Sequence, residues 1–403
     1  MKTPRVAFLV LCLTVILLAG CSSPAPEALG TVEEVTAPAP QSSGQPNLTV
    51  GASGKTYLSW IETGDTGSAT LKFAVKTPQG WSDPQKVTES FNMMVNWADF
   101  PSLFELSEGV LAAHWLAALP DADEGYNVAI ALSKDEGKTW SMPITPHRDG
   151  KKAEHGFVSL APAPGNKGVS VVWLDSRKLE DGAGEVALMQ TTVAPDGTLA
   201  AESEIDPRVC ECCQPSTVAV PGGLLAVYRD RSEGEIRDIA ITRFDGSRWS
   251  EPKTVFDDNW NIQACPIQGP AIAVAGDNVV VAWFTAPDDK ARVQVAFSKD
   301  GGKSFASPVQ VDDGKALGRV DVAITDSGNA IVTWIENAAA GGELRAREVG
   351  PDGKKHDSRM IAKTSIGNAS GFPRVKRTAG GLVFAWTDTE DHRVRTAIAK
   401  AAK

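Results

Sequence analysis

The chain alternates short apolar runs with polar turns, and seven of these runs end in an aromatic residue followed closely by a polar or charged one. The successive spacings are 55, 58, 55, 55, 51 and 52 residues, and the aromatic residues are Trp60, Trp115, Trp173, Tyr228, Trp283, Trp334 and Trp386. Each unit has the same order: a strand that opens near Pro or Gly, a turn, an apolar strand that ends at the aromatic residue, a variable loop and two further strands. None of the units shows helical periodicity. Such a period indicates one supersecondary unit copied around a ring. The sequence therefore predicts an all-β propeller of seven four-stranded antiparallel blades.

The last unit of the repeat is incomplete. After Trp386 the chain has one further strand, within residues 392–403, and no fourth strand follows. Propellers commonly close by borrowing a strand from the other terminus, because an unpaired strand edge is open to association. Residues 30–36, Gly-Thr-Val-Glu-Glu-Val-Thr, are the one strand-like stretch near the N-terminus, so we expect them to complete the last blade.

The first residues have the composition of an export signal. Basic residues at Lys2 and Arg5 precede an apolar stretch, residues 6–18, and the chain then reads Leu-Ala-Gly-Cys21. This ending resembles the bacterial lipobox. The resemblance implies that residues 1–20 are a lipoprotein signal peptide and that Cys21 carries the lipid, which makes a bilayer the first expected partner.

A tether is expected to join this anchor to the propeller. Residues 21–47 are rich in Pro, Ala, Ser, Glu and Gly and poor in large apolar residues, so they cannot bury enough surface to fold, whereas residues 48–403 hold the repeat. Ser22 after the lipidated cysteine resembles the pattern for the outer membrane, and we expect the protein to face the periplasm or the cell surface. The net charge of −10 argues against a nucleic-acid partner.

Two turns between third and fourth strands carry a specific sequence. Residues 133–140 read Ser-Lys-Asp-Glu-Gly-Lys-Thr-Trp, residues 298–305 read Ser-Lys-Asp-Gly-Gly-Lys-Ser-Phe, and weaker copies lie at 80–84 and 245–252. These turns resemble the Asp-box, or BNR repeat, of the sialidase superfamily, and with the weaker copies the resemblance covers residues 48–403. It implies a propeller in which the boxes stabilise turns away from the active face. Sialidases of this superfamily have six blades, which is the alternative to seven.

The resemblance does not extend to the catalytic residues of sialidases. That family holds a substrate carboxylate with three arginines, beginning in the first blade, and uses a tyrosine nucleophile paired with a glutamate, with an aspartate as acid. This chain has no arginine between Arg5 and Arg148, and its last tyrosine is Tyr228, at a repeat position. Ordinary sialidase chemistry is therefore not expected.

The repeat register predicts where a site would lie. Loops that enter the innermost strands and loops that leave the second strands share one face of a propeller, around its channel. On that face, the carboxylates that could serve as acid and nucleophile are Asp99, Asp175, Asp230 and Glu336. The arginines that could hold an anionic ligand are Arg177, Arg229, Arg231, Arg237, Arg319 and Arg374, and we expect Arg319 and Arg374 to point into the channel. The alternative is that these charges pair with one another across blade junctions and rigidify the ring.

Four cysteines follow the predicted anchor. Cys210, Cys212 and Cys213 lie in the loop entering the fourth blade and Cys265 in the loop entering the fifth, so the register brings all four together. An exported protein favours a disulfide, from Cys212 or Cys213 to Cys265. The alternative is a thiolate site for Cu(I) or Zn(II). Since the five histidines show no close spacing, no zinc motif is expected from them, and no cofactor is predicted.

Three functions remain open on these grounds. The first is a lipid-anchored propeller that binds an anionic small molecule, a glycan or a protein on its arginine-rich channel face. The second is a sialidase-like glycoside hydrolase that uses the carboxylates of that face. The third is copper handling by the cysteine cluster.

Overall fold

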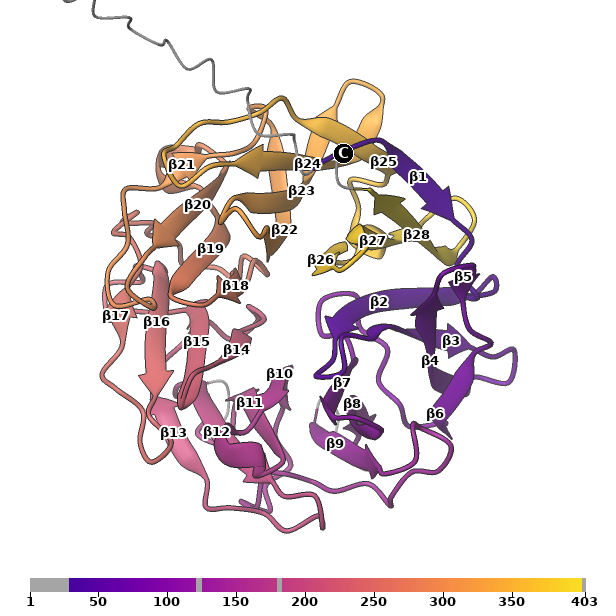
Figure 1. The fold of residues 1–403 in the computed structure, drawn as a ribbon. Coiled ribbons are helices and arrows are strands. Elements are labelled where there is room, and N and C mark those ends of the chain that lie inside the picture. Colours follow the sequence, from indigo (N-terminus) through magenta and orange to yellow (C-terminus); the bar gives the residue numbers. More distant parts are fainter. Residues whose placement is uncertain (1–28, 121–124, 180–182, 401–403) are drawn as a thin grey trace, which may run out of the picture.

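The computed structural model describes residues 29–120, 125–179 and 183–400. Within them, seven antiparallel sheets stand in a ring around a central axis (Figure 1). The predicted all-β propeller is confirmed, and it has seven blades, not six. In these ranges no helix is long and apolar enough to cross a membrane. The predicted signal peptide and Cys21 lie outside the described residues.

Each blade runs from an inner strand beside the channel to an outer strand at the rim. From the first to the seventh blade, the inner strands are β2 (Ser43–Val50), β7 (Ser102–Ser107), β10 (His155–Pro162), β14 (Ser216–Val220), β18 (Ala271–Ala275), β22 (Ala316–Ile324) and β26 (Arg374–Thr378). The second strands are β3 (Thr56–Thr63), β8 (Val110–Ala118), β11 (Val169–Asp175), β15 (Gly223–Arg229), β19 (Asn278–Thr285), β23 (Ala330–Ala338) and β27 (Gly381–Asp388). The third strands are β4 (Ala69–Thr77), β9 (Tyr126–Ser133), β12 (Ala187–Val193), β16 (Ile239–Phe244), β20 (Arg292–Ser298), β24 (Gly341–Val349) and β28 (Arg393–Ala399).

The outer strands are shorter and less regular. They are β5 (Gly80–Trp81) and β6 (Gln85–Ser90) in the first blade, then β13 (Ser203–Asp206), β17 (Lys253–Thr254), β21 (Val309–Gln310), β25 (Arg359–Thr364) and β1 (Val32–Val35) in the third to seventh blades. In the second blade the outer strand is reduced to a bridge between Ile130 and Ile144. Single 3-10 turns occur at η1 (Pro164–Asn166), η2 (Pro287–Asp289) and η3 (Asn368–Ser370).

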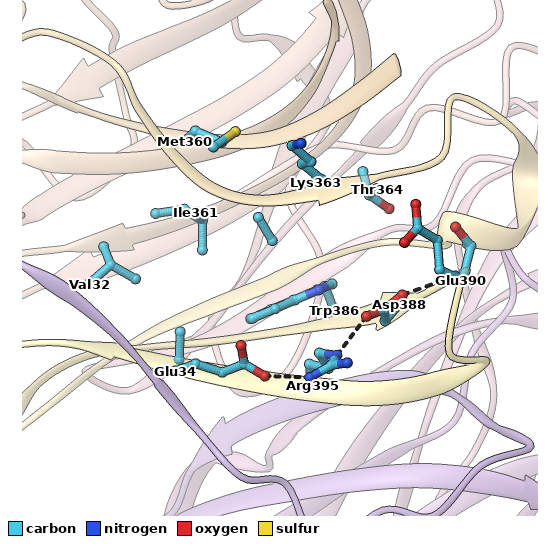
Figure 2. A pocket seen from close by; sticks show the side chains of 13 residues that line it. Val32, Glu34, Met360, Ile361, Lys363, Thr364, Trp386, Asp388, Glu390 and Arg395 are labelled. Carbon is cyan, nitrogen blue, oxygen red and sulfur yellow. Dashed lines mark hydrogen bonds and ion pairs between the residues drawn. The ribbon is translucent and has the colours of Figure 1, made fainter. Parts of the chain in front are cut away.

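The two ends of the chain close the ring, as predicted. Strand β1 pairs antiparallel with β28, from Val32 opposite Ala399 to Val35 opposite Thr396, and so becomes the outer strand of the last blade. Just before it, Leu29 is buried among apolar residues of the sixth and seventh blades. A cavity of about 460 Å³ remains between β25 and the β1–β28 pair (Figure 2).

The repeated aromatic residues are the structural centres of the blades. Trp60, Trp173 and Trp334 are fully buried in second strands, because large apolar rings fill the space between neighbouring sheets. A buried indole N–H must be satisfied, and in three blades it donates to a carboxylate two residues later. These bonds are Trp60 to Glu62 at 2.9 Å, Trp173 to Asp175 at 2.7 Å and Trp334 to Glu336 at 2.6 Å. The acidic residue after the aromatic is therefore part of the scaffold in these blades.

The Asp-boxes form turns after third strands, at the opposite end of the ring from the loops that enter the inner strands. In the second blade, Asp135 accepts hydrogen bonds from the backbone N–H of Thr139 at 2.9 Å and from its hydroxyl at 2.7 Å. These bonds lower the pKa of Asp135 to about 2. The Ser133 hydroxyl accepts from the Gly137 N–H at 2.8 Å, and Gly137 has a φ of 87°. The box in the fifth blade repeats this geometry.

Candidate functional site

The central channel holds a cavity of about 510 Å³ to which the inner strands of all seven blades contribute. Its wall is largely hydroxyl-bearing and apolar, with a few charges. The polar lining includes Thr49, Ser102, Ser159, Thr217, Asp321 and Arg374. The volume lies within the range of small-molecule sites, about 300–1,000 Å³.

Aromatic side chains cluster at the end of this channel that faces the predicted site. Trp97, in the loop entering the second blade, stacks on Phe372, in the loop entering the seventh, with ring centroids 6.0 Å apart. Phe100 lies 5.7 Å from Phe372, and Phe157 of the third blade packs in the same cluster. In this cluster, called here the aromatic plug, the three phenylalanines are buried, Trp97 is half-buried, and Phe100 lines the channel cavity.

Arg374 is the one of the six predicted arginines that lines the channel cavity. Its guanidinium lies over the ring of Phe100, 3.9 Å from the centroid. The Nε and Nη2 atoms are inaccessible to solvent and have no hydrogen-bond partner among the described residues. Burial lowers the pKa of Arg374, and the nearby Asp321 charge opposes this shift. Arg374 thus keeps two buried donors that no described residue satisfies.

Arg319 is buried behind the aromatic plug and does not line the cavity. It lies over Trp97, 5.1 Å from the ring centroid, donates to the Gly367 carbonyl at 2.9 Å and also bonds the Ser370 hydroxyl. Its pKa is lowered to about 10 by burial. The expectation that Arg319 points into the channel is therefore wrong, because a β-bulge with a φ of 57° at this residue turns its side chain toward the η3 segment.

Two arginines of the fourth blade belong to an ion-pair network. Arg231 pairs with Glu235 at 2.9 Å and with Glu211, while Arg237 pairs with Glu211 at 2.7 Å and Glu235 at 3.1 Å. Glu235 has a pKa lowered to about 2, chiefly by its hydrogen bond to Arg231. Arg231 and Arg237 therefore pair with protein carboxylates, as the alternative to ligand binding predicts.

Arg229 is also used within the fold. Its side chain is buried and donates to the carbonyls of Gln268 at 2.9 Å, Arg237 at 2.6 Å and Phe284 at 2.6 Å, and it lies over the ring of Trp260. It therefore joins the fourth and fifth blades by satisfying backbone acceptors.

The four predicted carboxylates have different surroundings. Asp175 and Glu336 are buried, and each accepts the indole N–H of the tryptophan two residues before it. Asp99 is 2% exposed and accepts from the Phe157 N–H at 2.7 Å, and burial raises its pKa to about 7. Asp230 is partly exposed and accepts from the Arg231 N–H at 2.7 Å. Burial, with the Asp206 charge adding to it, raises the pKa of Asp230 to about 6.

A histidine pair, not expected from the sequence, lies on the same face. His147 and His155 stack with ring centroids 3.6 Å apart and planes 4° apart, and Asp149 lies against both. Burial lowers the pKa of His147 to about 4, and the neighbouring His155 adds to this shift. Both histidines lie in or beside one loop that enters the third blade, which the eight-residue spacing alone did not reveal.

Arg177 borders this histidine pair. It binds Asp175 through Nη2 at 2.6 Å and Glu202 through Nη1 at 2.8 Å. Burial raises the pKa of Asp175, but the hydrogen bonds from Arg177 and Trp173 outweigh it, and the pKa lies below its ordinary range. Arg177 is thus engaged in ion pairs and does not extend into the channel cavity.

The cysteine loops meet where the register places them. Cys212 and Cys265 form a disulfide between the fourth and fifth blades, and Cys210 and Cys213 are buried free thiols with Sγ atoms 2.9 Å apart. Arg237 donates to Cys210 Sγ at 3.4 Å. For Cys210, burial raises the pKa, but the Cys213 hydrogen bond and the Arg229 charge outweigh it and the pKa is lowered to about 7.

Comparison with known proteins gives the fold's relatives. The family model described as BNR repeat-like domain matches residues 54–319. Among solved structures, an α-L-arabinanase from Penicillium chrysogenum complexed with arabinobiose is 11% identical, with a TM-score of 0.52 over 92% of this chain and 98% of that one. A protein of unknown function from Dyadobacter fermentans is 12% identical, with a TM-score of 0.51 over 94% and 100%. The Trypanosoma rangeli sialidase in complex with the inhibitor DANA is 13% identical, with a TM-score of 0.45 over 80% and 57%. No curated protein sequence matches the chain.

Proposed function

The chain belongs to the family of BNR repeat-like domains, and from that premise we propose that it is an exported, lipid-anchored propeller that binds a small anionic ligand in its central channel. The single observation that carries the proposal is Arg374, a guanidinium at the channel wall with buried, unpartnered Nε and Nη2 atoms. Removing an arginine from water without a partner is costly, and a shift of the Arg374 side chain off Phe100 would let a ligand carboxylate supply the partner in bidentate form.

The rest of the channel suits an acidic sugar. Hydroxyls of the channel wall, such as those of Ser159 and Ser216, offer hydrogen bonds to sugar hydroxyls. Lys376 adds a positive charge, although its ammonium already lies 3.1 Å from Asp321. An acidic monosaccharide or short acidic glycan therefore matches the wall better than a neutral one.

Calorimetric titration of the purified protein with glucuronate, N-acetylneuraminate and neutral glucose tests this function. We expect the acidic sugars to bind and glucose to bind much more weakly, and we expect Arg374→Ala to weaken acid binding at least about tenfold. Arg248→Ala is the matched control, since the Arg248 side chain is 87% exposed at the surface. Unchanged binding to Arg374→Ala, or no binding of either acid by the natural chain, would contradict the proposal.

A glycoside hydrolase is the second candidate, and the raised pKa of Asp230 favours it. A carboxyl with a pKa of about 6 retains part of its proton near neutral pH, as a general acid requires, and Asp230 is partly exposed. The arabinanase of similar fold supplies a first substrate class to try. Hydrolysis of fluorogenic arabinosides or sialosides that Asp230→Asn abolishes would establish this candidate.

The anchor is tested separately. We expect the natural chain to sediment with membranes and to incorporate a labelled fatty acid, because Cys21 follows a lipobox-like sequence. Cys21→Ser should be recovered in the soluble fraction without label. Label in the Cys21→Ser variant would exclude this residue as the lipidation site.

A further inference from the structure

The sulfur atoms of four cysteines lie together between the fourth and fifth blades. Cys210 Sγ is within 4.8 Å of the Sγ atoms of Cys212, Cys213 and Cys265. It is therefore near both sulfurs of the Cys212–Cys265 disulfide, and it is 2.9 Å from the free thiol of Cys213. Disulfides exchange when a thiolate attacks one of their sulfurs, so Cys210 is placed both to attack the disulfide and to be attacked by Cys213.

Cys210 and Cys213 can also form a disulfide with each other. Glu211 and Cys212 form a turn between them, and the first and last Cα atoms of such a turn lie less than about 7 Å apart. A disulfide spans about 4.4–6.8 Å between Cα atoms, so the turn suits one. The two Sγ atoms, 2.9 Å apart, need to approach by only about 0.9 Å to reach the bond length. The pair is therefore a dithiol that can be oxidised without rearranging the loop.

The charges around the thiols leave one buried cation without a close carboxylate. Ion pairs join three arginines to three glutamates beside the cysteine loop, so this network balances: Arg208, Arg231, Arg237, Glu185, Glu211 and Glu235. Arg229 is 1% exposed, donates to three backbone carbonyls and makes no ion pair among the described residues. Its charge also reaches Asp238 and Asp258, but burial raises the pKa of both carboxyls. A thiolate is thus favoured beside Arg229.

The two thiols differ in acidity, and the difference assigns their roles. Against the effect of burial, the Cys213 hydrogen bond and the Arg229 charge lower the pKa of Cys210 to about 7. Arg237 also donates to Cys210 Sγ, at 3.4 Å. Burial, with the hydrogen bond to Cys210 adding to it, raises the pKa of Cys213. Because the thiolate is the nucleophile, Cys210 attacks first and Cys213 reacts second.

We propose that these four cysteines are a thiol–disulfide exchange centre, in which Cys210 attacks the Cys212–Cys265 disulfide at Cys265. The Cys210–Cys265 bond forms, the Cys212–Cys265 bond breaks, and Cys212 leaves as a thiolate that takes the proton of Cys213. Cys213 then attacks Cys210, and Cys265 leaves as a thiolate. The product has a Cys210–Cys213 disulfide, and no electrons are gained or lost overall. Attack at Cys212 instead would close a loop of only three residues, which is too short to be relaxed.

The exchange moves a disulfide from the surface to the interior. Cys265 is exposed and Cys212 is half-buried, whereas Cys210 and Cys213 are 0% and 1% exposed. An external thiol or disulfide of small size, such as glutathione, meets Cys265 directly and exchanges with the buried pair only through this step. The centre thus couples opening of the link between the fourth and fifth blades to oxidation of the buried pair.

The test is alkylation of the folded full chain with N-ethylmaleimide, followed by acid quenching and unfolding in a second maleimide of different mass. Fragment mass spectrometry then locates each label and each disulfide. The first reagent removes every thiol that reaches the surface, so it draws the exchange toward its product. We expect its label at Cys212 and Cys265, with a Cys210–Cys213 disulfide. Label at Cys210 or Cys213 with the Cys212–Cys265 disulfide intact, or no label from the first reagent at these four cysteines, would overturn the proposal.

Two variants separate the steps, and circular dichroism shows whether each keeps the fold. Cys213→Ser lacks the second attack, so we expect the exchange to stop at a Cys210–Cys265 disulfide with label at Cys212. Cys210→Ser lacks the first nucleophile, and the raised pKa of Cys213 leaves that residue mostly a thiol at neutral pH. We therefore expect labelling of Cys265 to be at least about tenfold slower in Cys210→Ser than in the natural chain. Equal labelling rates in the two folded proteins would also overturn the proposal.

Discussion

Replacing Asp99 by asparagine should change how the stability of the propeller depends on pH. Asp99 is 2% exposed, and its one hydrogen bond in the described structure comes from the Phe157 N–H. An asparagine side chain has the same shape and can accept that bond through its oxygen, but it has no proton to lose. The comparison therefore isolates the cost of ionising one buried carboxyl.

The magnitude follows from the pKa. Burial raises the pKa of Asp99 from 3.8 to about 7, so the folded protein binds this proton more tightly than the unfolded chain does. Between these two values the unfolded chain releases the proton and the folded protein keeps it, and stability falls as pH rises. At about 1.4 kcal/mol per pH unit, the loss between pH 4.5 and pH 8 is roughly 3 kcal/mol.

The assay is urea unfolding of both proteins at pH 4.5 and pH 8, followed by tryptophan fluorescence. The amide of the substituted side chain adds a cost that does not depend on pH, so the quantity of interest is the change in the difference between the two proteins. We expect Asp99→Asn to gain about 3 kcal/mol relative to the natural chain on going from pH 4.5 to pH 8. A difference that stays constant would show that Asp99 ionises normally in the folded state and would refute the reasoning.

Three further substitutions test the scaffold, each by urea unfolding at neutral pH. Gly137→Ala should lower the free energy of unfolding by about 2–4 kcal/mol, because φ is 87° and the new Cβ would lie 2.4 Å from a ring carbon of Phe73. Gly54→Ala is the control: its φ is 79° but the space around it is open, so only the backbone strain of about 1–2 kcal/mol is expected. Equal losses in the two variants would contradict the steric clash. Leu29→Ala should lower the free energy of unfolding by about 2–4 kcal/mol if ring closure depends on this buried residue. Glu33→Ala, at an exposed position, should change it by no more than about 0.5 kcal/mol. An unchanged stability of Leu29→Ala would show that Leu29 does not stabilise the ring closure. Glu336→Ala should lower the free energy of unfolding by about 2 kcal/mol or more, because it leaves the indole N–H of Trp334 unpaired. Glu336→Gln should lower it less, because the amide oxygen can still accept this hydrogen bond. Equal losses in the two variants would argue against the hydrogen bond.

The fold was predictable because the repeat imposes the same physical demand in every blade. Each unit must bury one large ring at the same place between sheets, so Trp60 and its counterparts keep their spacing. The ring closure was predictable for a related reason, since β28 would otherwise present an open edge that residues 32–35 cover. The cysteines came together because loops entering adjacent blades are neighbours by construction.

The site was less predictable, because its contacts lie in loops that the repeat does not constrain. Trp97 and Phe372 meet across the channel end although they come from the second and seventh blades, and no local pattern announces that contact. The same holds for His147 and His155, whose stacking depends on how one irregular loop folds back on the start of β10. Whether an arginine pairs with a carboxylate, as Arg177 does, or keeps unpartnered donors, as Arg374 does, depends on side-chain distances of this kind.

The fourth blade shows how a departure from the repeat can free a residue for chemistry. In the first, third and sixth blades the repeat position is a tryptophan, and its indole N–H donates a hydrogen bond to the carboxylate two residues later. In the fourth blade the aromatic is Tyr228, and its hydroxyl instead donates to Asp206 at 2.6 Å. Asp230, at the position of those scaffold carboxylates, is left without the aromatic donor, and burial, with the Asp206 charge adding to it, raises its pKa to about 6. Asp230 therefore keeps a raised pKa, which is the property that the second candidate function uses, while Asp175 and Glu336 each accept the indole N–H of a tryptophan.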